Sequence, residues 1–409
     1  MEVILTKIDK ARKLLSKSIN FKIEGTDKLK VQDSLDRVSS KTIKSKFNLP
    51  QTKNSAVDGF AISFKDILNN DKQKYEVIGM AKAGHPFLNK ALKNQAVEIY
   101  TGAIMPKDLD CVVMHENTKR IDNNIIIKKV PQKGLNVRPA GENIKVNEII
   151  IKKGKKINSP DIGQLAASGN NEIEVFKKIN ISIFSTGDEV VDPSRKLKRG
   201  QIFDANRSML FSMLNNKNAN LIDGGIVEDK LSALTRKYKN SIQSNDVIIS
   251  SGGASDGIED HTQNALKNIG TKLIFWQLAI KPGKPMAIAK YNKTLIFCLP
   301  GNPVAAYVCT QLLIKPAIEK ISGSNFEEPF YVFLPSGFDH KKKVGRTEYL
   351  RCKIVTIDNI SKIFVNGRKG AGVISSLTGA DGLVEIPDDV SSVKVDQLLK
   401  FLPFSHHTL

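Results

Sequence analysis

Apolar residues follow several different patterns along the chain, and each pattern predicts a different kind of structure. In residues 1–20 they recur every three or four positions with lysines between, which predicts an amphipathic helix. Between about residues 26 and 150, short β-rich runs separated by Gly, Pro and Asn predict a small β-rich domain. Ser159 followed by Pro160 is a typical helix start, with the serine as cap.

Strand and helix patterns alternate between about residues 176 and 325. The predicted strands are 179–184, 220–226, 246–250 and 294–299, and the predicted helices are 208–214, 230–241, 262–269 and 302–314. Such alternation predicts a mostly parallel sheet with helices on both faces, which binds ligands beyond the carboxyl ends of its strands. From about residue 326 strands return without helices, at 330–334, 348–357, 363–366 and 383–386. The fold class is therefore α/β plus β, in several domains.

The chain is strongly basic. Its 409 residues include 62 Lys and Arg against 42 Asp and Glu, a formal net charge of +20. This excess favours an anionic partner, either nucleic acid or a small polyanion. The lysines are scattered and aromatic residues make up 6%, which argues against a nucleic-acid interface. We therefore expect a small anionic ligand.

Other classes are excluded by what the sequence lacks. It has no uninterrupted apolar run of 18 residues, so we expect no membrane span. Residues 1–20 place charges among the apolar positions, unlike a signal peptide, and we expect a cytoplasmic protein. The four cysteines are far apart and predict buried thiols instead of a zinc site or disulfides: Cys111, Cys298, Cys309 and Cys352.

Two strand-end loops could bind a phosphate. Residues 185–189 read Ser-Thr-Gly-Asp-Glu, and residues 250–257 read Ser-Ser-Gly-Gly-Ala-Ser-Asp-Gly. Paired glycines let backbone N–H groups approach an anion, and the start of the following helix adds partial positive charge. A plain glycine turn explains the second loop equally well.

A third loop carries two lysines in a stiff setting. Residues 281–285 read Lys-Pro-Gly-Lys-Pro, so Lys281 and Lys284 are presented in a fixed geometry that suits an oxyanion. Residues 299–303 read Leu-Pro-Gly-Asn-Pro, which a helix start explains by itself. Four acids near these strand ends could hold Mg²⁺ or could be solvated loop residues: Glu189, Asp204, Asp256 and Asp260.

Taken in order, these segments resemble the molybdopterin molybdenumtransferase (MoeA) family, which includes the E domain of gephyrin. The resemblance covers nearly the whole chain. It rests on residues 55–61 (Ser-Ala-Val-Asp-Gly-Phe-Ala), 101–103 (Thr-Gly-Ala), the four loops above and 345–351 (Gly-Arg-Thr-Glu-Tyr-Leu-Arg).

The resemblance implies four regions. They are a helical linker and dimerisation region of residues 1–25 and 147–175, a β-rich domain of residues 26–146, a molybdopterin-binding α/β domain of residues 176–325 and a C-terminal β-barrel of residues 326–409. It also implies a homodimer in which Asp58, Thr101 and Glu142 face the partner's site. An upstream molybdopterin adenylyltransferase is the expected further partner.

The implied reaction inserts molybdate into adenylated molybdopterin with release of AMP. Molybdate would be held by Lys281, Lys284 and Arg351. The pterin phosphate would be held by the glycine loop, and Mg²⁺ by Asp260 with Glu189 and Asp204. The implied catalytic residues are Asp260, Glu189, Asp58, Thr101 and Glu142, and the implied substrate-binding residues are Ser251, Gly252, Gly253, Ser255, Asp256, Lys281, Lys284, Pro300, Gly301, Asn302 and Arg351.

Two alternatives remain open. The protein could be an adenylyltransferase that makes the adenylated substrate, although residues 26–150 and 326–409 would then be superfluous, or a non-catalytic scaffold like gephyrin's E domain. The chain also departs from the family pattern at Asn143, where an aspartate is common, and at Ala371, where a serine is common. Both stay outside the expected site, and Ser375 or Ser376 is the candidate to supply the missing hydroxyl.

Overall fold

The computed structural model describes residues 5–69, 73–253, 261–368 and 370–404. The chain forms two compact units, one of residues 1–27, 36–40 and 175–409 and the other of residues 28–35 and 41–174. Of the four points at which the chain passes between the units, the first lies within β1 (Thr26–Lys30) and the last within β12 (Glu172–Phe176). No helix in the described ranges combines the length and the apolar character needed to span a membrane. The division into four regions stays a prediction.

The first unit contains a six-stranded sheet in the order β16-β13-β17-β21-β20-β18. The first four strands are parallel, as predicted, whereas β20 runs antiparallel to both β21 and β18; neither β20 nor β18 was predicted. The strands are β13 (Ile179–Thr186), β16 (Ala219–Val227), β17 (Val247–Ser251), β18 (Lys272–Trp276), β20 (Ala287–Tyr291) and β21 (Thr294–Leu299).

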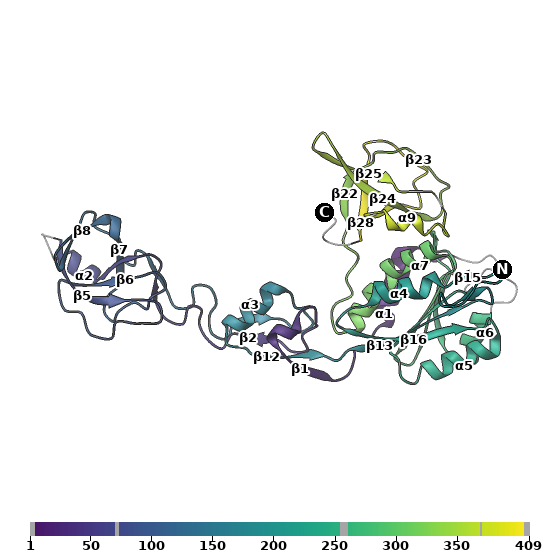
Figure 1. Ribbon diagram of the computed structural model, residues 1–409, viewed down its shortest axis with the longest axis horizontal. Helices are drawn as coiled ribbons and strands as arrows, with labels where there is room; N and C mark the ends of the chain where they lie inside the picture. The colour runs from purple at the N-terminus through teal and green to yellow at the C-terminus, as the bar shows by residue number, and fades with distance from the viewer. Residues whose placement is uncertain (1–4, 70–72, 254–260, 369, 405–409) are drawn as a thin grey trace. The chain divides into compact units, whose positions relative to one another are not determined.

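Helices cover both faces of this sheet (Figure 1). Because side chains alternate along a strand, Ile181 and Ile183 of β13 enter the core beneath α1, α4 and α7, whereas Phe184 enters the core beneath α5 and α6. The helices are α1 (Ile8–Ser18), α4 (Ala205–Leu214), α5 (Leu231–Ser241), α6 (His261–Asn268), α7 (Pro303–Cys309), a π-helical turn (Thr310–Ile314) and α8 (Lys315–Ile321). The helix predicted at 302–314 therefore continues to Ile321.

The C-terminal part of this unit is a second sheet, ordered β19-β24-β26-β28-β22 with β25 beside β24. A backbone bridge between Ser336, just after β22, and Ile363 of β25 closes the sheet on itself, in agreement with the predicted barrel. The elements are β19 (Ile280–Lys281), β22 (Val332–Pro335), β23 (His340–Lys341), β24 (Thr347–Ile357), β25 (Ile360–Val365), α9 (Ser375–Thr378), β26 (Gly382–Ile386), β27 (Ser392–Val393) and β28 (Leu398–Pro403). The short helix α9 was not predicted.

The second unit contains a six-stranded sheet ordered β7-β4-β6-β5-β9-β8, with β5 and β6 parallel. Phe60 and Ile62 of β4 pack into one core and Ala61 into the other, so both faces of the sheet are covered. The elements are β2 (Ile43–Lys44), β3 (Asn54–Ser55), β4 (Gly59–Ile62), α2 (Phe64–Ile67), β5 (Lys74–Ala81), β6 (Gln95–Ile99), β7 (Cys111–Met114), β8 (Thr118–Ile121), β9 (Asn124–Ile127), β10 (Val137–Arg138), β11 (Ile149–Ile151) and α3 (Ser159–Ala167).

One local expectation needs correction and two are confirmed. The cap of α3 is Asn158 and not Ser159, because the Asn158 side chain accepts from Asp161 N while the Asp161 carboxylate accepts from Asn158 N. The apolar face of α1 is covered inside its own unit, where Ile8, Ala11 and Leu15 join the main core. All four cysteines are buried free thiols, as predicted.

Candidate functional site

Three strand-end loops meet at one edge of the parallel sheet. Ser185 of β13, Ser251 of β17 and Leu299 of β21 lie in register, so the segments that follow them leave the sheet side by side. They surround a cavity of about 580 Å³, here called the strand-end cavity. Its lining includes Thr186, Gly187, Glu189, Asp204, Asn206, Asp229, Ser251, Gly252, Gly253, Pro285, Pro300, Gly301 and Asn302.

The loop that follows β17, called the glycine loop, requires glycine at positions 252 and 253. Gly252 has φ +90°, and a Cβ atom there would lie 2.1 Å from the carbonyl oxygen of Thr186. Gly253 has φ +71°, and its Cβ would lie 2.4 Å from Thr262 Oγ1. The close backbone approach is therefore a structural requirement of this edge of the sheet. Ser255 and Asp256, expected in the same loop, lie outside the described residues.

Unsatisfied hydrogen-bonding groups surround this loop. Asn206 of α4 donates through Nδ2 to Ser251 Oγ and to the carbonyl oxygen of Gly301, both at 2.7 Å, which joins two of the loops. Its Oδ1 atom is buried and has no partner within the described residues, and the same is true of Thr186 Oγ1 and Thr262 Oγ1. Buried polar atoms are normally paired, and Thr186 and Asn206 line the strand-end cavity, so a ligand or water there could complete these two. Sequence reasoning missed Asn206, because a buried asparagine on a helix carries no motif of its own.

Asp204 has a structural role. It is the N-cap of α4, it accepts from Ser185 Oγ at 2.9 Å, and it pairs with Arg207 Nε at 3.0 Å. Glu189, in contrast, is exposed at the rim of the strand-end cavity. No group of three or more His, Cys, Asp or Glu side chains in the described ranges is arranged to hold a metal ion, and Asp260 lies outside those ranges. The metal role of these residues stays a prediction.

Arg207 holds the loop that follows β13. Besides Asp204 it contacts Asp223 through Nη1 and Asp192 through Nη2, the latter at 2.6 Å. Hydrogen bonds from Ser194, and then the one from Arg207, lower the pKa of Asp192 to about 2. The cluster therefore ties the segment between β14 (Val190–Val191) and β15 (Ile202–Phe203) to α4 only while the carboxylates are ionised.

We expect Arg207→Met to lower the melting temperature at pH 7. The difference in melting temperature between variant and wild type should become smaller in acid. Because the pKa of Asp192 is depressed in the folded protein, its stabilisation is complete above the unfolded value of about 4. It is lost as the pH falls toward about 2. Thermal unfolding from pH 7 to pH 2 measures this, with Arg236→Met on α5 as the control. A difference that stays constant with pH would contradict the role of Asp192.

A second cavity, of about 390 Å³, lies between the α/β sheet and the barrel, and we call it the cation cavity. β19 pairs in parallel with β24, which places Lys281 opposite Glu348 and brings Arg351 of the barrel to the lysine loop. Pro285, Pro300 and Asn302 line both cavities, so the two share a wall. The cation cavity is lined by Lys281, Lys284, His340, Lys341, Arg346, Glu348, Arg351, Gly370 and Ala371, among others.

Arg351 is buried and firmly held. Its Nε donates to Ser376 Oγ at 2.9 Å, and its Nη2 donates to the carbonyl oxygens of Arg368 and Gly370 at 3.2 and 3.3 Å. Burial lowers the pKa of Arg351, but the guanidinium is still charged at neutral pH. Ser376, one of the two serines proposed to supply a hydroxyl, thus touches the expected oxyanion residue, and Ala371 lines the same cavity as Arg351.

The remaining predicted site residues belong to the second unit. Asp58 Oδ1 accepts from both the backbone N and the Oγ1 of Thr101, each at 2.7 Å, and these bonds lower the pKa of Asp58. Glu142 forms a surface ion pair with Arg138, with 3.7 Å between Glu142 Oε2 and Arg138 Nε. Asp58 and Thr101 therefore come together as a pair, while their role at a partner's site stays a prediction.

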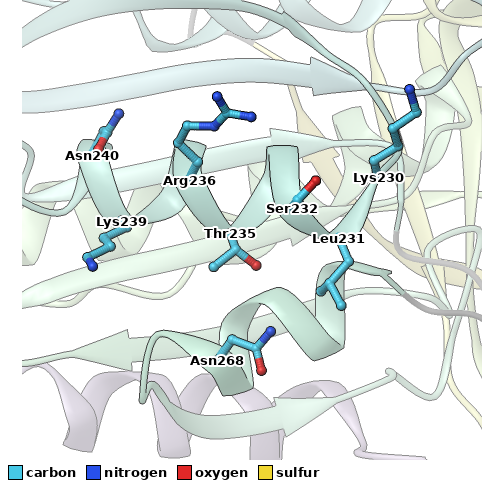
Figure 2. A pocket seen from close by; sticks show the side chains of 8 residues that line it. All are labelled: Lys230, Leu231, Ser232, Thr235, Arg236, Lys239, Asn240 and Asn268. Carbon is cyan, nitrogen blue, oxygen red and sulfur yellow. The ribbon is translucent and has the colours of Figure 1, made fainter.

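A third hollow, of about 800 Å³, opens along α5 and α6 (Figure 2). Figure 2 shows two of its cations, Arg236 and Lys239, on α5 and the third, Lys230, just before the helix begins, so they are not gathered at one point. The lining consists of Lys230, Leu231, Ser232, Thr235, Arg236, Lys239, Asn240 and Asn268, and so offers no aromatic ring on which a base could stack.

Comparisons with known proteins agree along the whole chain. Family models match residues 6–169 (MoeA N-terminal region, domain I and II), 182–320 (probable molybdopterin binding domain) and 334–404 (MoeA C-terminal region, domain IV). The molybdopterin molybdenumtransferase of Haemophilus influenzae is 30% identical over 403 residues, 98% of each chain. That of Nostoc sp. is 30% identical over 359 residues, 86% of this chain and 82% of the relative. The crystal structure of the molybdopterin biosynthesis moeA protein from Pyrococcus horikoshii OT3 is similar with a TM-score of 0.83 at 26% identity, and covers 97% of this chain and 99% of that one.

Proposed function

Because the chain belongs to the molybdopterin molybdenumtransferase (MoeA) family, we propose that it inserts molybdate into adenylated molybdopterin and releases AMP. The observation that carries this proposal is the pair of cavities with a shared wall. One offers backbone and hydroxyl donors for phosphate, and the other offers fixed cations for an oxyanion. Two anionic substrates could thus be held side by side, which is what a transfer between them requires.

In this proposal the cation cavity holds molybdate. Lys284 is half-buried, and its carbonyl oxygen accepts from both Leu278 N and Met286 N at 2.9 Å, so its backbone is fixed. Together with Lys281 and Arg351 it would bind the oxyanion through charge-assisted hydrogen bonds.

The strand-end cavity holds the phosphates of the adenylated substrate. Their donors would be the backbone N–H of Gly253 and the Ser251 hydroxyl, with Gly301 and Asn302 on the facing loop, whereas Gly252 N–H already donates to Leu299 O at 3.2 Å. The unsatisfied Thr186 and Asn206 oxygens lie in the same lining and could accept from the substrate's hydroxyl or ring N–H groups. Catalysis would then depend on positioning and electrostatics, without a covalent nucleophile.

We propose that Mg²⁺ is held by Glu189 and Asp260, and that Asp204 serves only as a cap and ion-pair partner. The donor chemistry fits a hard cation: Asp229 lines the same cavity, and its pKa is raised by burial and by the neighbouring Asp188 and Glu189 carboxylates, although His261 acts to lower it. Such crowding of acids would be relieved by a cation. When bound, Mg²⁺ supplies Lewis-acid polarisation of the phosphoanhydride.

We further propose a cytoplasmic homodimer that receives its substrate from a molybdopterin adenylyltransferase. The apolar face of α1 gives no support for a dimer, because it is buried inside its own unit. The proposal now rests on the family resemblance and on exposed leucines of the second unit, notably Leu88 at 88% and Leu92 at 65% exposure.

We expect light scattering at micromolar concentration to give twice the 45.1 kDa chain mass. A dimer would allow Asp58, Thr101 and Glu142 to complete the partner's site. A strict monomer over the whole concentration range would remove that role. Leu88→Asp combined with Leu92→Asp is the matched test of the surface, and it should shift the protein toward the monomer.

The test of the proposed function is AMP release from adenylated molybdopterin with and without molybdate. Molybdate-dependent release supports the proposal. Formation of adenylated molybdopterin from ATP would support an adenylyltransferase instead. Absence of both activities, together with absence of molybdate binding, would support a scaffold.

A further inference from the structure

A single acidic side chain, Glu348, is built into the lining of the cation cavity. The lining otherwise carries five basic side chains, namely Lys281, Lys284, Lys341, Arg346 and Arg351, and His340. Within the described lining Glu348 has no acidic neighbour, and only 5% of its surface is exposed. A buried carboxylate in a cavity for anions opposes binding of those anions, so its presence needs an explanation.

Both oxygens of Glu348 are engaged. Oε1 lies 2.8 Å from Lys281 Nζ, and Oε2 lies 2.9 Å from Nε2 of the buried His340. Burial acts to raise the pKa of Glu348, but the hydrogen bonds from Lys281 and His340 outweigh it and hold the pKa below its ordinary value. The carboxylate is therefore ionised at neutral pH.

The backbone fixes this arrangement. The parallel pair of β19 and β24 places Lys281 opposite Glu348, and the pairing of β23 with β27 places His340 opposite Val393. The Lys281 side chain is 59% exposed, so its ammonium can reach either the carboxylate or a ligand in the cavity. An oxyanion that contacts Lys281 must thus compete with Glu348.

We propose that Glu348 is a built-in counter-ion of Lys281 that limits the affinity of the cation cavity for its oxyanion. This inference rests on the proposed function. Tight binding of the oxyanion substrate does not by itself speed the transfer. If the ground state is stabilised more than the transition state, the barrier to transfer rises. Because Glu348 competes with the oxyanion for Lys281, it weakens binding of the oxyanion before transfer. His340 holds the second carboxylate oxygen and so keeps the carboxylate facing the lysine.

The test is molybdate binding to full-length Glu348→Gln by isothermal titration calorimetry. Glutamine keeps the shape and an acceptor oxygen for Lys281 but removes the charge. We expect molybdate to bind about 10-fold tighter, since a repulsive charge next to the dianion is gone. We also expect slower AMP release at saturating molybdate. Glu385→Gln is the control: Glu385 lies on the neighbouring strand β26, bonds to Tyr331 and Tyr349, and does not line the cavity.

Unchanged or weaker molybdate binding by folded Glu348→Gln would overturn the proposal, as would tighter binding by the Glu385→Gln control. If Glu348→Gln does not fold, Glu348→Asp decides: it withdraws the carboxylate from Lys281 and should bind molybdate more tightly than the wild type, whereas equal or weaker binding overturns the inference. Failure of the wild type to bind molybdate would instead count against the proposed function.

Discussion

Replacing Gly252 with alanine is expected to abolish measurable turnover and to destabilise the first unit. The residue has φ +90°, and its new Cβ would lie 2.1 Å from Thr186 O, a backbone atom that cannot move away without disturbing β13. Backbone strain and overpacking each cost about 1 to 3 kcal/mol, so the free energy of unfolding should fall by about 2 to 6 kcal/mol. Urea unfolding measures the stability, and quenching of intrinsic fluorescence measures binding of adenylated molybdopterin, which should weaken at least about 100-fold.

Gly270→Ala is the matched control. Gly270 has φ +77°, but a Cβ there would meet nothing within 4 Å. It should carry the backbone strain alone, about 1 kcal/mol, and leave substrate binding unchanged. If the two variants behave alike, the close approach of the glycine loop to β13 has no part in the site, and the phosphates must bind elsewhere.

The parallel core of the α/β sheet could be predicted because its strands are buried on both faces. The strand Val247–Ser251, for example, is an apolar run that ends at a glycine pair. The strands β18, at the edge, and β20, beside it, were missed because they lack such a signal: Leu273 of β18 is exposed, and β20 runs antiparallel to both of its neighbours. Their place in the sheet follows from tertiary contacts and not from local pattern.

The convergence of the strand-end loops could also be predicted, because parallel strands end at one edge. The contacts of Asp204 could not be predicted, because a solvated loop aspartate and a helix-capping aspartate have the same sequence signature. Only the structure shows that the backbone N and the Nε of Arg207 donate to Asp204. The contact of Lys281 with Glu348 was likewise missed. The motifs that contain the two residues were recognised. Their contact depends on the parallel pairing of two residues of β19 with β24, and such a short pairing leaves no pattern in the sequence.

Replacing Lys284 with alanine is expected to weaken molybdate binding by about 10-fold to 100-fold, because a charge-assisted hydrogen bond contributes about 1.5 to 3 kcal/mol. Lys281→Ala should weaken it at least as much, since it also leaves the Glu348 carboxylate in the cavity with His340 alone. Adenylated molybdopterin should bind normally to both variants, because its phosphates depend on the glycine loop. Calorimetry with each ligand separately measures this selectivity.

Lys239→Ala on α5 is the control for net charge: it removes the same charge from the same unit, but Lys239 lines the hollow of Figure 2 and not the cation cavity. If high molybdate concentration restores AMP release by Lys284→Ala, the lysine acts in binding the oxyanion. If molybdate binding is unchanged while turnover falls, Lys284 acts in the chemical step. The long-range effect of the +20 net charge would then be sufficient to gather molybdate, and the fixed lysine would act on the charge that develops during transfer.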